Sequence, residues 1–365
     1  MCSHDRIKRS TGLLRAGGGV LAYDRRVTER AGGGVPRWLR RTVTVLVTIV
    51  AVVAALVIGL TVLPSNPPVA VSPGALTSEQ AEAGFADLIA KDTADPTVLP
   101  ECKSLDVRPT VPQLGVVLLF HGYTSCPNQF SALAGRLAAA GYRVLVPRWP
   151  EHGIADTDAE PNPVDGQELA NFTMRTTAIA LGLDKRTVVG GLSGGATLAL
   201  WAAEHNAEVQ RVVALAPFLG PTSVPTVLSH ATGNAMRLAP NVDVWWNFSR
   251  KEADQVPRYS YAKFATKSLA GLMSLGSTLG ATRSNAYVVH VLNGADASVD
   301  PAVVRALVGR QRDAGDLVSL YEFPASLQAP HAYVDPDDPA NKIEQTLPAL
   351  VDLFTTGATG LLTPS

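Results

Sequence analysis

The residues best placed to do chemistry surround Ser193, in the segment Gly191-Leu192-Ser193-Gly194-Gly195. An apolar run, Thr187–Gly190, precedes this segment, and an alanine-rich helical pattern, Ala196–His205, follows it. A tight turn between a strand and a helix needs small residues on either side, because Cβ atoms there would clash. Such a turn lifts the hydroxyl out of the sheet, so the pattern predicts a nucleophilic serine.

A serine hydroxyl is a poor nucleophile unless a base accepts its proton and an acid orients that base. Asp296 follows one predicted strand, and His331 is the only one of the seven histidines that follows the last predicted strand. Both would lie at the sheet edge that carries Ser193, so we predict that these three residues form a catalytic triad. Asp300 follows the same strand as Asp296 and remains an alternative acid.

The oxyanion formed by such an attack needs hydrogen-bond donors. One candidate is the N–H of Gly194, which follows the nucleophile at the start of a helix. The other donor is expected in the loop after the first buried strand, His121-Gly122-Tyr123-Thr124-Ser125, and we assign it to the N–H of Tyr123. We interpret His121 as a buried residue that holds this loop.

The elements that would position these groups alternate between strand and helix. Continuous apolar runs are typical of strands buried on both faces, and this alternation predicts an α/β fold with a mostly parallel sheet covered by helices on both faces. The predicted strands are Val116–Phe120, Tyr142–Val146, Thr187–Gly190, Val212–Leu215, Tyr287–Leu292 and Val318–Phe323. The predicted helices are Phe130–Ala140, Glu168–Leu181, Ala196–His205, Pro301–Asp313 and Leu347–Phe354.

Residues 217–285 interrupt this alternation and are rich in aromatic residues and turn formers. We predict that they form an insertion over the carboxyl edge of the sheet. For each aromatic residue of the insertion, both packing within it and contact with a ligand remain open.

Together these motifs resemble the carboxylesterase and monoacylglycerol-lipase branch of the α/β hydrolases, over about two-thirds of the chain, Val111 to Phe354. The matching residues are His121-Gly122-Tyr123, Gly141-Tyr142-Arg143-Val144, Glu151-His152-Gly153, Gly191 to Gly195, Asp296 and His331. The resemblance implies an α/β-hydrolase fold in which residues 217–285 form a lid over an acyl pocket. Two positions depart from the family pattern. Gly194 stands where Met or Gln is often found, and Asp296 comes two residues after Gly294, where three is commoner.

The N-terminal part of the chain has a different character. Val43 to Leu63 is a run of 21 residues without a charge, long enough to cross a bilayer. Residues 1–42 hold ten Lys or Arg and three Asp or Glu, whereas the rest of the chain holds 21 and 29, so the net charge of −1 conceals an asymmetry. Because basic flanks stay in the cytoplasm, we predict a single-pass protein of the cell membrane whose catalytic domain is extracytoplasmic.

No A-x-A cleavage site follows the apolar run, which favours an uncleaved anchor; secretion after signal cleavage is the alternative. The predicted organisation is a disordered basic cytoplasmic segment at 1–42, a transmembrane helix at 43–63, a Pro-rich tether at 64–75 and a hydrolase domain at 76–365.

Two of the three cysteines, Cys102 and Cys126, would share an oxidising compartment in this topology. We predict that they form a disulfide bond; two unrelated buried thiols are the alternative.

The function indicated is hydrolysis of a small-molecule or lipid ester through an acyl-enzyme on Ser193, with no metal or organic cofactor required. Acyl transfer or peptide hydrolysis on the same triad remains open, as does a binding protein built on an inactive hydrolase fold. The mildly acidic composition after residue 63 argues against nucleic-acid binding. The sequence does not indicate an oligomeric state.

Overall fold

The computed structural model describes residues 11–12, 23–24, 36–64, 66–246, 257–357 and 361–364. It comprises two compact units, Met1–Val57 and Ile58–Ser365.

In the residues that the structure describes, the first unit is mainly an apolar helix, whose last residues, from Ile58, belong to the second unit. This helix, α1 (Arg37–Val62), buries none of its residues and is long and apolar enough to cross a membrane. It begins six residues before the predicted span, because the residues from Arg37 to Thr42 include good helix formers that continue its first turns. The short strands β1 (Thr11–Gly12) and β2 (Tyr23–Asp24) pair antiparallel. Most of the segment predicted to be disordered, 1–42, lies outside the described residues.

The second unit is built on an eight-stranded sheet with the order β12-β11-β10-β7-β6-β4-β5-β3. The six central strands run parallel, and each lies within two residues of its predicted bounds. The edge strands β3 and β12 run antiparallel and were not predicted, because each is too short to show an alternating pattern. The strands are β3 (Leu105–Val107), β4 (Gly115–Phe120), β5 (Tyr142–Val146), β6 (Thr187–Leu192), β7 (Arg211–Leu215), β10 (Tyr287–Asn293), β11 (Leu317–Phe323) and β12 (Thr363–Pro364).

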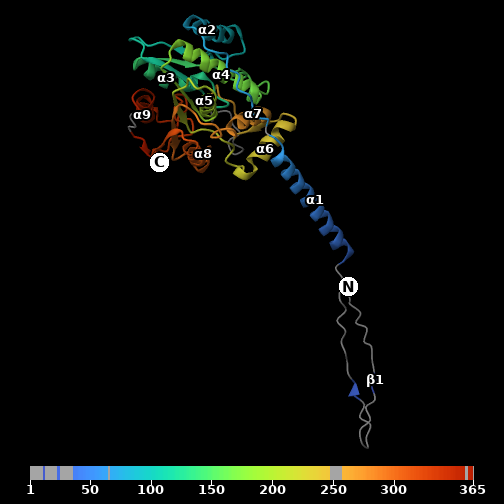
Figure 1. The fold of residues 1–365 in the computed structure, drawn as a ribbon. Coiled ribbons are helices and arrows are strands. Elements are labelled where there is room, and N and C mark those ends of the chain that lie inside the picture. Colours follow the sequence, from blue (N-terminus) through green and yellow to red (C-terminus); the bar gives the residue numbers. More distant parts are fainter. Residues whose placement is uncertain are drawn as a thin grey trace, which may run out of the picture. The chain divides into compact units, whose positions relative to one another are not determined.

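Helices cover both faces of this sheet, as the sequence predicts (Figure 1). Alternate residues of β4 enter different hydrophobic clusters: Val116 and Leu118 pack in the cluster of α2, α4 and α5, whereas Val117 packs in the cluster of α3 and α9. The covering helices are α2 (Ser78–Ala94), α3 (Ser131–Ala139), α4 (Gly166–Leu183), α5 (Gly194–His205), α8 (Pro301–Asp313) and α9 (Ile343–Thr355). Short 3-10 helices lie at Pro100–Cys102, Pro127–Phe130 and Ala325–Leu327.

The segment predicted as a tether, residues 64–75, is attached to the sheet domain. The side-chain amide of Gln167 in α4 bonds both backbone groups of Val69: it accepts from the N–H and donates to the carbonyl, each at 2.8 Å. A capping box then opens α2, in which Thr77 and Gln80 satisfy each other's backbone N–H groups.

The insertion after β7 contains regular structure. It comprises α6 (Thr226–Leu238), the antiparallel pair β8 (Asp243–Trp245) and β9 (Lys263–Ala265), and α7 (Thr266–Gly276). Most of α7 is buried and packs against α4 and α5. The α7 part of the insertion therefore belongs to the core.

Candidate active site

Ser193 occupies a strained turn between β6 and α5. Its backbone angles, φ 56° and ψ −119°, lie in a region that residues other than glycine rarely adopt. The turn is possible because of the glycines on each side. A Cβ on Gly195 would lie 1.9 Å from the carbonyl oxygen of Phe120, and a Cβ on Gly191 would lie 2.3 Å from the carbonyl carbon of Gly195. The turn thus places the Ser193 side chain at the carboxyl edge of the sheet.

His331 and Asp296 meet at this same edge. His331 Nδ1 lies 2.7 Å from Asp296 Oδ2, and the Asp296 side chain is only 4% exposed against 23% for His331. The other carboxylate oxygen of Asp296 accepts the N–H groups of Ser298, at 2.7 Å, and Val299, at 3.3 Å. Burial alone would raise the pKa of Asp296, but the hydrogen bond from His331 and these two N–H groups outweigh it, so the pKa lies below its usual value.

The ionised carboxylate determines how the imidazole is protonated. Because it can only accept hydrogen bonds, Nδ1 of His331 carries the proton that faces Asp296, and Nε2 points away from this carboxylate. Asn293 fixes the histidine loop, since its amide donates to the carbonyls of Ala329, at 2.9 Å, and Pro330, at 3.0 Å. Asp296 and Asn293 therefore fix the orientation of the His331 ring and of the loop that carries it.

Asp300, the alternative acid, makes a different contact. Its carboxylate accepts the N–H of Ala302 at 2.8 Å and caps the start of α8. The structure thus brings Asp296 to His331 and uses Asp300 as a helix cap.

The loop after β4 leaves one backbone N–H available. Gly122 donates its N–H to Gln129 Oε1 at 2.7 Å, Thr124 to His152 Nε2 at 3.2 Å, and Ser125 to the Gly122 carbonyl at 3.1 Å. Within the described residues no hydrogen bond takes the N–H of Tyr123. The same holds for Gly194, which begins α5 and so has no partner inside the helix. Both expected oxyanion donors are therefore available, and they lie close together, since a Cβ on Gly194 would be 3.0 Å from that of Tyr123.

Two buried neutral histidines support this loop. His152 donates from Nδ1 to the Pro150 carbonyl and accepts the Thr124 N–H at Nε2; His121 donates from Nδ1 to the Gly122 carbonyl and accepts the N–H of Trp149 at Nε2. A ring nitrogen that accepts a hydrogen bond cannot carry a proton. Burial lowers the pKa of His152 to about 4 and that of His121 well below its usual value, so both rings stay neutral.

A disulfide bond ends the same loop. Cys102 and Cys126 are joined, as the sequence predicts, and both are fully buried. Tyr259 packs against this pair, and its hydroxyl donates to Asp335. Because Asp335 lies four residues after His331, this tyrosine connects the disulfide to the histidine loop.

The glycine at position 194, one of the two departures from the expected family pattern, has a packing explanation. A Cβ on Gly194 would lie 2.9 Å from Leu272 of α7 and 3.3 Å from Trp149, in addition to its contact with Tyr123. Side chains from elsewhere in the chain thus fill the space that a larger residue would occupy.

Trp246 connects the insertion to the nucleophile region. Its indole N–H donates to Thr124 Oγ1 at 3.1 Å, and its ring lies 5.9 Å from the ring of Tyr123 and 6.2 Å from that of Phe218. The N–H of Phe218 in turn donates to the carbonyl of Ser193 at 3.1 Å. These contacts join the insertion to the loop after β4 and to the turn of Ser193.

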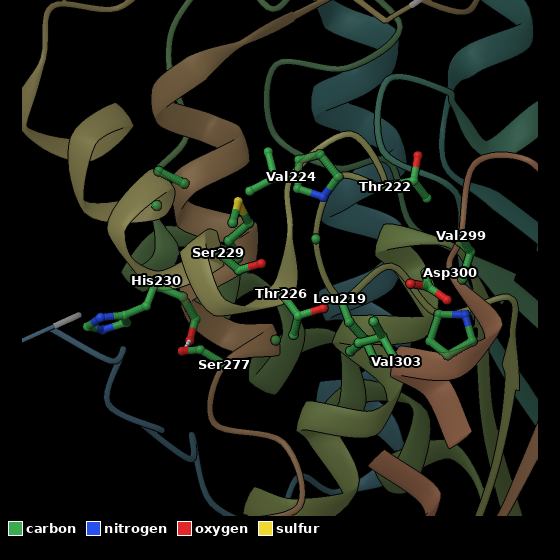
Figure 2. Close-up of a pocket in the computed structure, with 18 of the residues that line it drawn as sticks. Leu219, Thr222, Val224, Thr226, Ser229, His230, Ser277, Val299, Asp300 and Val303 are labelled. Carbon is green, nitrogen blue, oxygen red and sulfur yellow. Dashed lines mark hydrogen bonds between the residues drawn. The ribbon is translucent and has the colours of Figure 1, made fainter. Parts of the chain in front are cut away.

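A cavity of about 340 Å³ lies beneath α6 (Figure 2). Its walls come from the loop after β7, from α6 and α7 and from the start of α8; Figure 2 shows Ser229 and His230 on one side and Asp300 and Val303 on the other. Its lining in the described chain includes neither Ser193 nor His331, although it includes Leu219, the neighbour of Phe218. The described residues hold no group of three or more His, Cys, Asp or Glu side chains arranged for a metal ion.

Comparison with known proteins agrees with this architecture. A family model described as the alpha/beta hydrolase fold matches residues 115–270. A thermostable monoacylglycerol lipase of Bacillus sp. (strain H-257) is 32% identical over 123 residues, which are 32% of this chain and 45% of the lipase. An esterase of Escherichia coli (strain K12), YjfP, is 36% identical over 96 residues, 24% of this chain and 39% of the esterase. The chain has the α/β-hydrolase fold and is similar to lipases and esterases.

Solved structures with the α/β-hydrolase fold align over most of the sheet domain. A monoacylglycerol lipase of Paleococcus ferrophilus superposes with a TM-score of 0.54 at 18% identity, covering 70% of this chain and 98% of that protein. A structure from a study of the metagenome-derived lipolytic enzymes LipS and LipT superposes with a TM-score of 0.53 at 22% identity, covering 71% and 99%. The sequence matches are shorter: the chain spans less than half the length of each curated relative named above.

Several supporting residues of this site carry no sequence signal. Tyr259 and Asn293 act through hydrogen bonds to a loop that is distant in the sequence, and Gln129 bonds Gly122 across the turn after β4. His152 stands in a motif that resembles the family, but only the structure shows that it accepts the Thr124 N–H.

We predict that loss of the disulfide destabilises the fold. The bond joins two residues with a sequence separation of 24. In the chain-entropy model a loop of this length raises the free energy of unfolding by about 3 kcal/mol. The double variant Cys102→Ala/Cys126→Ala should melt several degrees below the unaltered protein in differential scanning calorimetry. Cys2→Ser, which leaves the pair intact, is the control, and equal melting temperatures of the double variant and this control would contradict the prediction.

Proposed function

We propose that the protein is a membrane-anchored serine hydrolase that cleaves carboxylic esters through an acyl-enzyme on Ser193. The observation that carries this proposal is the Asp296–His331 hydrogen bond at the sheet edge where Ser193 occupies its strained turn. The similarity to a monoacylglycerol lipase and an esterase supports the same reaction class.

In this mechanism Nε2 of His331 takes the hydroxyl proton as Ser193 Oγ attacks the ester carbonyl. The buried carboxylate of Asp296 stabilises the imidazolium that forms. The negative charge on the substrate oxygen accepts hydrogen bonds from the N–H groups of Tyr123 and Gly194, and the start of α5 favours that charge. Collapse of the intermediate expels the alcohol, which receives the proton from His331. Water activated by the same imidazole then releases the acid and restores Ser193.

The proposed substrates are lipid esters with a single acyl chain. The ring of Trp246 packs against those of Tyr123 and Phe218, and the N–H of Phe218 donates to the Ser193 carbonyl, so aromatic side chains lie next to the proposed nucleophile. The similarity to a monoacylglycerol lipase agrees with this substrate class.

The proposed location is the cell membrane, with α1 as the anchor and residues after Leu63 outside the cytoplasm. The length and composition of α1 support this location, and the Cys102–Cys126 bond fits an oxidising compartment.

Removal of the nucleophile tests the reaction. Ser193→Ala should lower turnover of p-nitrophenyl acetate by about 10⁴-fold or more and abolish labelling by a fluorophosphonate probe. Ser78→Ala, which changes an exposed serine at the start of α2, is the matched control and should retain both activities. Substantial turnover by Ser193→Ala would show that another residue is the nucleophile.

The two acids are separated by a matched pair of substitutions. Asp296→Asn should lower turnover by about 10³-fold or more, because an amide no longer holds the imidazole in the required tautomer. Asp300→Asn should stay within about twofold of the unaltered protein, because asparagine also caps helices. Steady-state kinetics of both variants with one soluble ester decides the assignment, and the opposite ranking would make Asp300 the acid.

Protease accessibility tests the location. Protease added to intact cells or spheroplasts that express the full chain should remove the domain after residue 64 while a membrane-bound fragment with residues 1–63 persists. A mature protein that lacks residues 1–63 would instead indicate signal cleavage, and a protected domain would reverse the topology.

A further inference from the structure

The lid helix α6 binds the C-terminal end of the apolar helix α1. Three residues of α6, here called the α6 clamp, donate to backbone carbonyls there. Asn234 donates to Leu60 and Leu63, each at 2.9 Å; His230 donates from Nδ1 to Thr61 at 2.8 Å; Arg237 donates to Pro64 at 3.3 Å. Residues 58–64 belong to the same compact unit as α6.

These contacts satisfy groups that a helix cannot satisfy by itself. The last four carbonyls of a helix have no intrahelical partner, and Leu60 and Thr61 are among them. The α6 clamp supplies donors to both, and a cationic residue such as Arg237 suits the negative end of the helix dipole. Asn234 is only 3% exposed and uses its amide nitrogen on two carbonyls, so this contact is specific.

The face of α6 that carries Asn234 continues into exposed apolar side chains. Val227 and Leu238 are eleven residues apart, which is close to three helical turns, so they lie on the face of Asn234 at the two ends of α6. They are 80% and 58% exposed, and Val242, just beyond the helix, is also exposed. Val227 and Leu238 thus place exposed apolar side chains on both sides of the α6 clamp, which binds the end of an apolar helix. Such side chains are suited to contact with a lipid surface.

Behind α6 lies the cavity of Figure 2. The clamp residues His230, Asn234 and Arg237 also belong to its lining. A single helix thus separates this cavity from the end of α1.

We propose that the anchor and the lid act as one device: the α6 clamp, bound to the end of α1, holds the face of α6 marked by Val227 and Leu238 on the bilayer surface. The occupant of this face is the lipid bilayer in which α1 is anchored. The contact with the bilayer rests on the anchoring part of the proposed function. Its consequence, that lipid esters reach the domain directly from the membrane, rests on the proposed hydrolase activity as well.

A measurement of lipid contact tests the proposal without using activity. The full chain with Cys2→Ser receives one new cysteine, by Val227→Cys or Leu238→Cys, and this cysteine is labelled with an environment-sensitive fluorophore. The labelled protein is then reconstituted into phosphatidylcholine vesicles that contain nitroxide-labelled lipid, which quenches a fluorophore in contact with the bilayer. The controls are Val111→Cys and Leu317→Cys. Both are exposed apolar positions at the amino ends of the strands, one before β4 and one at the start of β11. Quenching should be severalfold stronger at 227 and 238 than at 111 and 317, and equal quenching would overturn the proposal.

The clamp itself is tested by Asn234→Leu, which keeps the side-chain size and removes both amide hydrogen bonds. Quenching at 238 should fall toward the level of the control positions in this variant. Unchanged quenching would show that the clamp does not hold α6 on the bilayer.

A kinetic arm tests the consequence for substrate entry. The double variant Val227→Asp/Leu238→Asp should hydrolyse a monoacylglycerol carried in the vesicle membrane severalfold more slowly than the unaltered protein, with p-nitrophenyl acetate turnover unaffected. Val111→Asp/Leu317→Asp should leave the ratio of the two rates unchanged. An equal ratio in both double variants would overturn membrane delivery. A protein that hydrolyses neither ester would contradict the proposed function, while the quenching result would still decide the contact with the bilayer.

Discussion

The site depends on the close approach of the start of α5 to the end of β4. Gly195 packs so tightly against the carbonyls of Phe120 and His121 that any side chain there would force the two elements apart. This contact brings the turn of Ser193 next to the loop that carries Tyr123. The N–H groups of Gly194 and Tyr123 come together for the same reason, although they are separated by about 70 residues in the chain.

The parts of the molecule that the sequence predicts are those that depend on local patterns. The apolar runs of β4 and β6 and the glycines around Ser193 indicate buried strands and a tight turn, because burial and steric clash act within a few residues. The choice between Asp296 and Asp300 could not be made in this way, since it depends on which carboxylate the His331 loop reaches after folding. The contacts of Asn293 and Tyr259 were not predicted either, because each joins segments that only tertiary packing brings together.

The insertion combines two physical roles that its composition does not distinguish. Its α7 is a buried core helix, and Leu272 occupies the space beside Gly194. In its α6, polar side chains of one face bond the backbone at the end of α1. Trp246, between the two, contacts the oxyanion loop. The stability of the core and the covering of the site are therefore linked through one continuous segment.

The neutral histidines beneath the oxyanion loop make the fold itself a proton-linked equilibrium. The folded protein keeps the pKa of His152 at about 4, against an ordinary value of 6.5, and that of His121 is also far below this value. Between pH 6.5 and about 4 these histidines bind protons in the unfolded chain but not in the folded one. Lowering the pH across this range therefore favours unfolding. At neutral pH both states leave these rings uncharged, and the difference disappears. The two histidines that support the loop therefore lower the free energy of unfolding as the pH falls below their ordinary pKa.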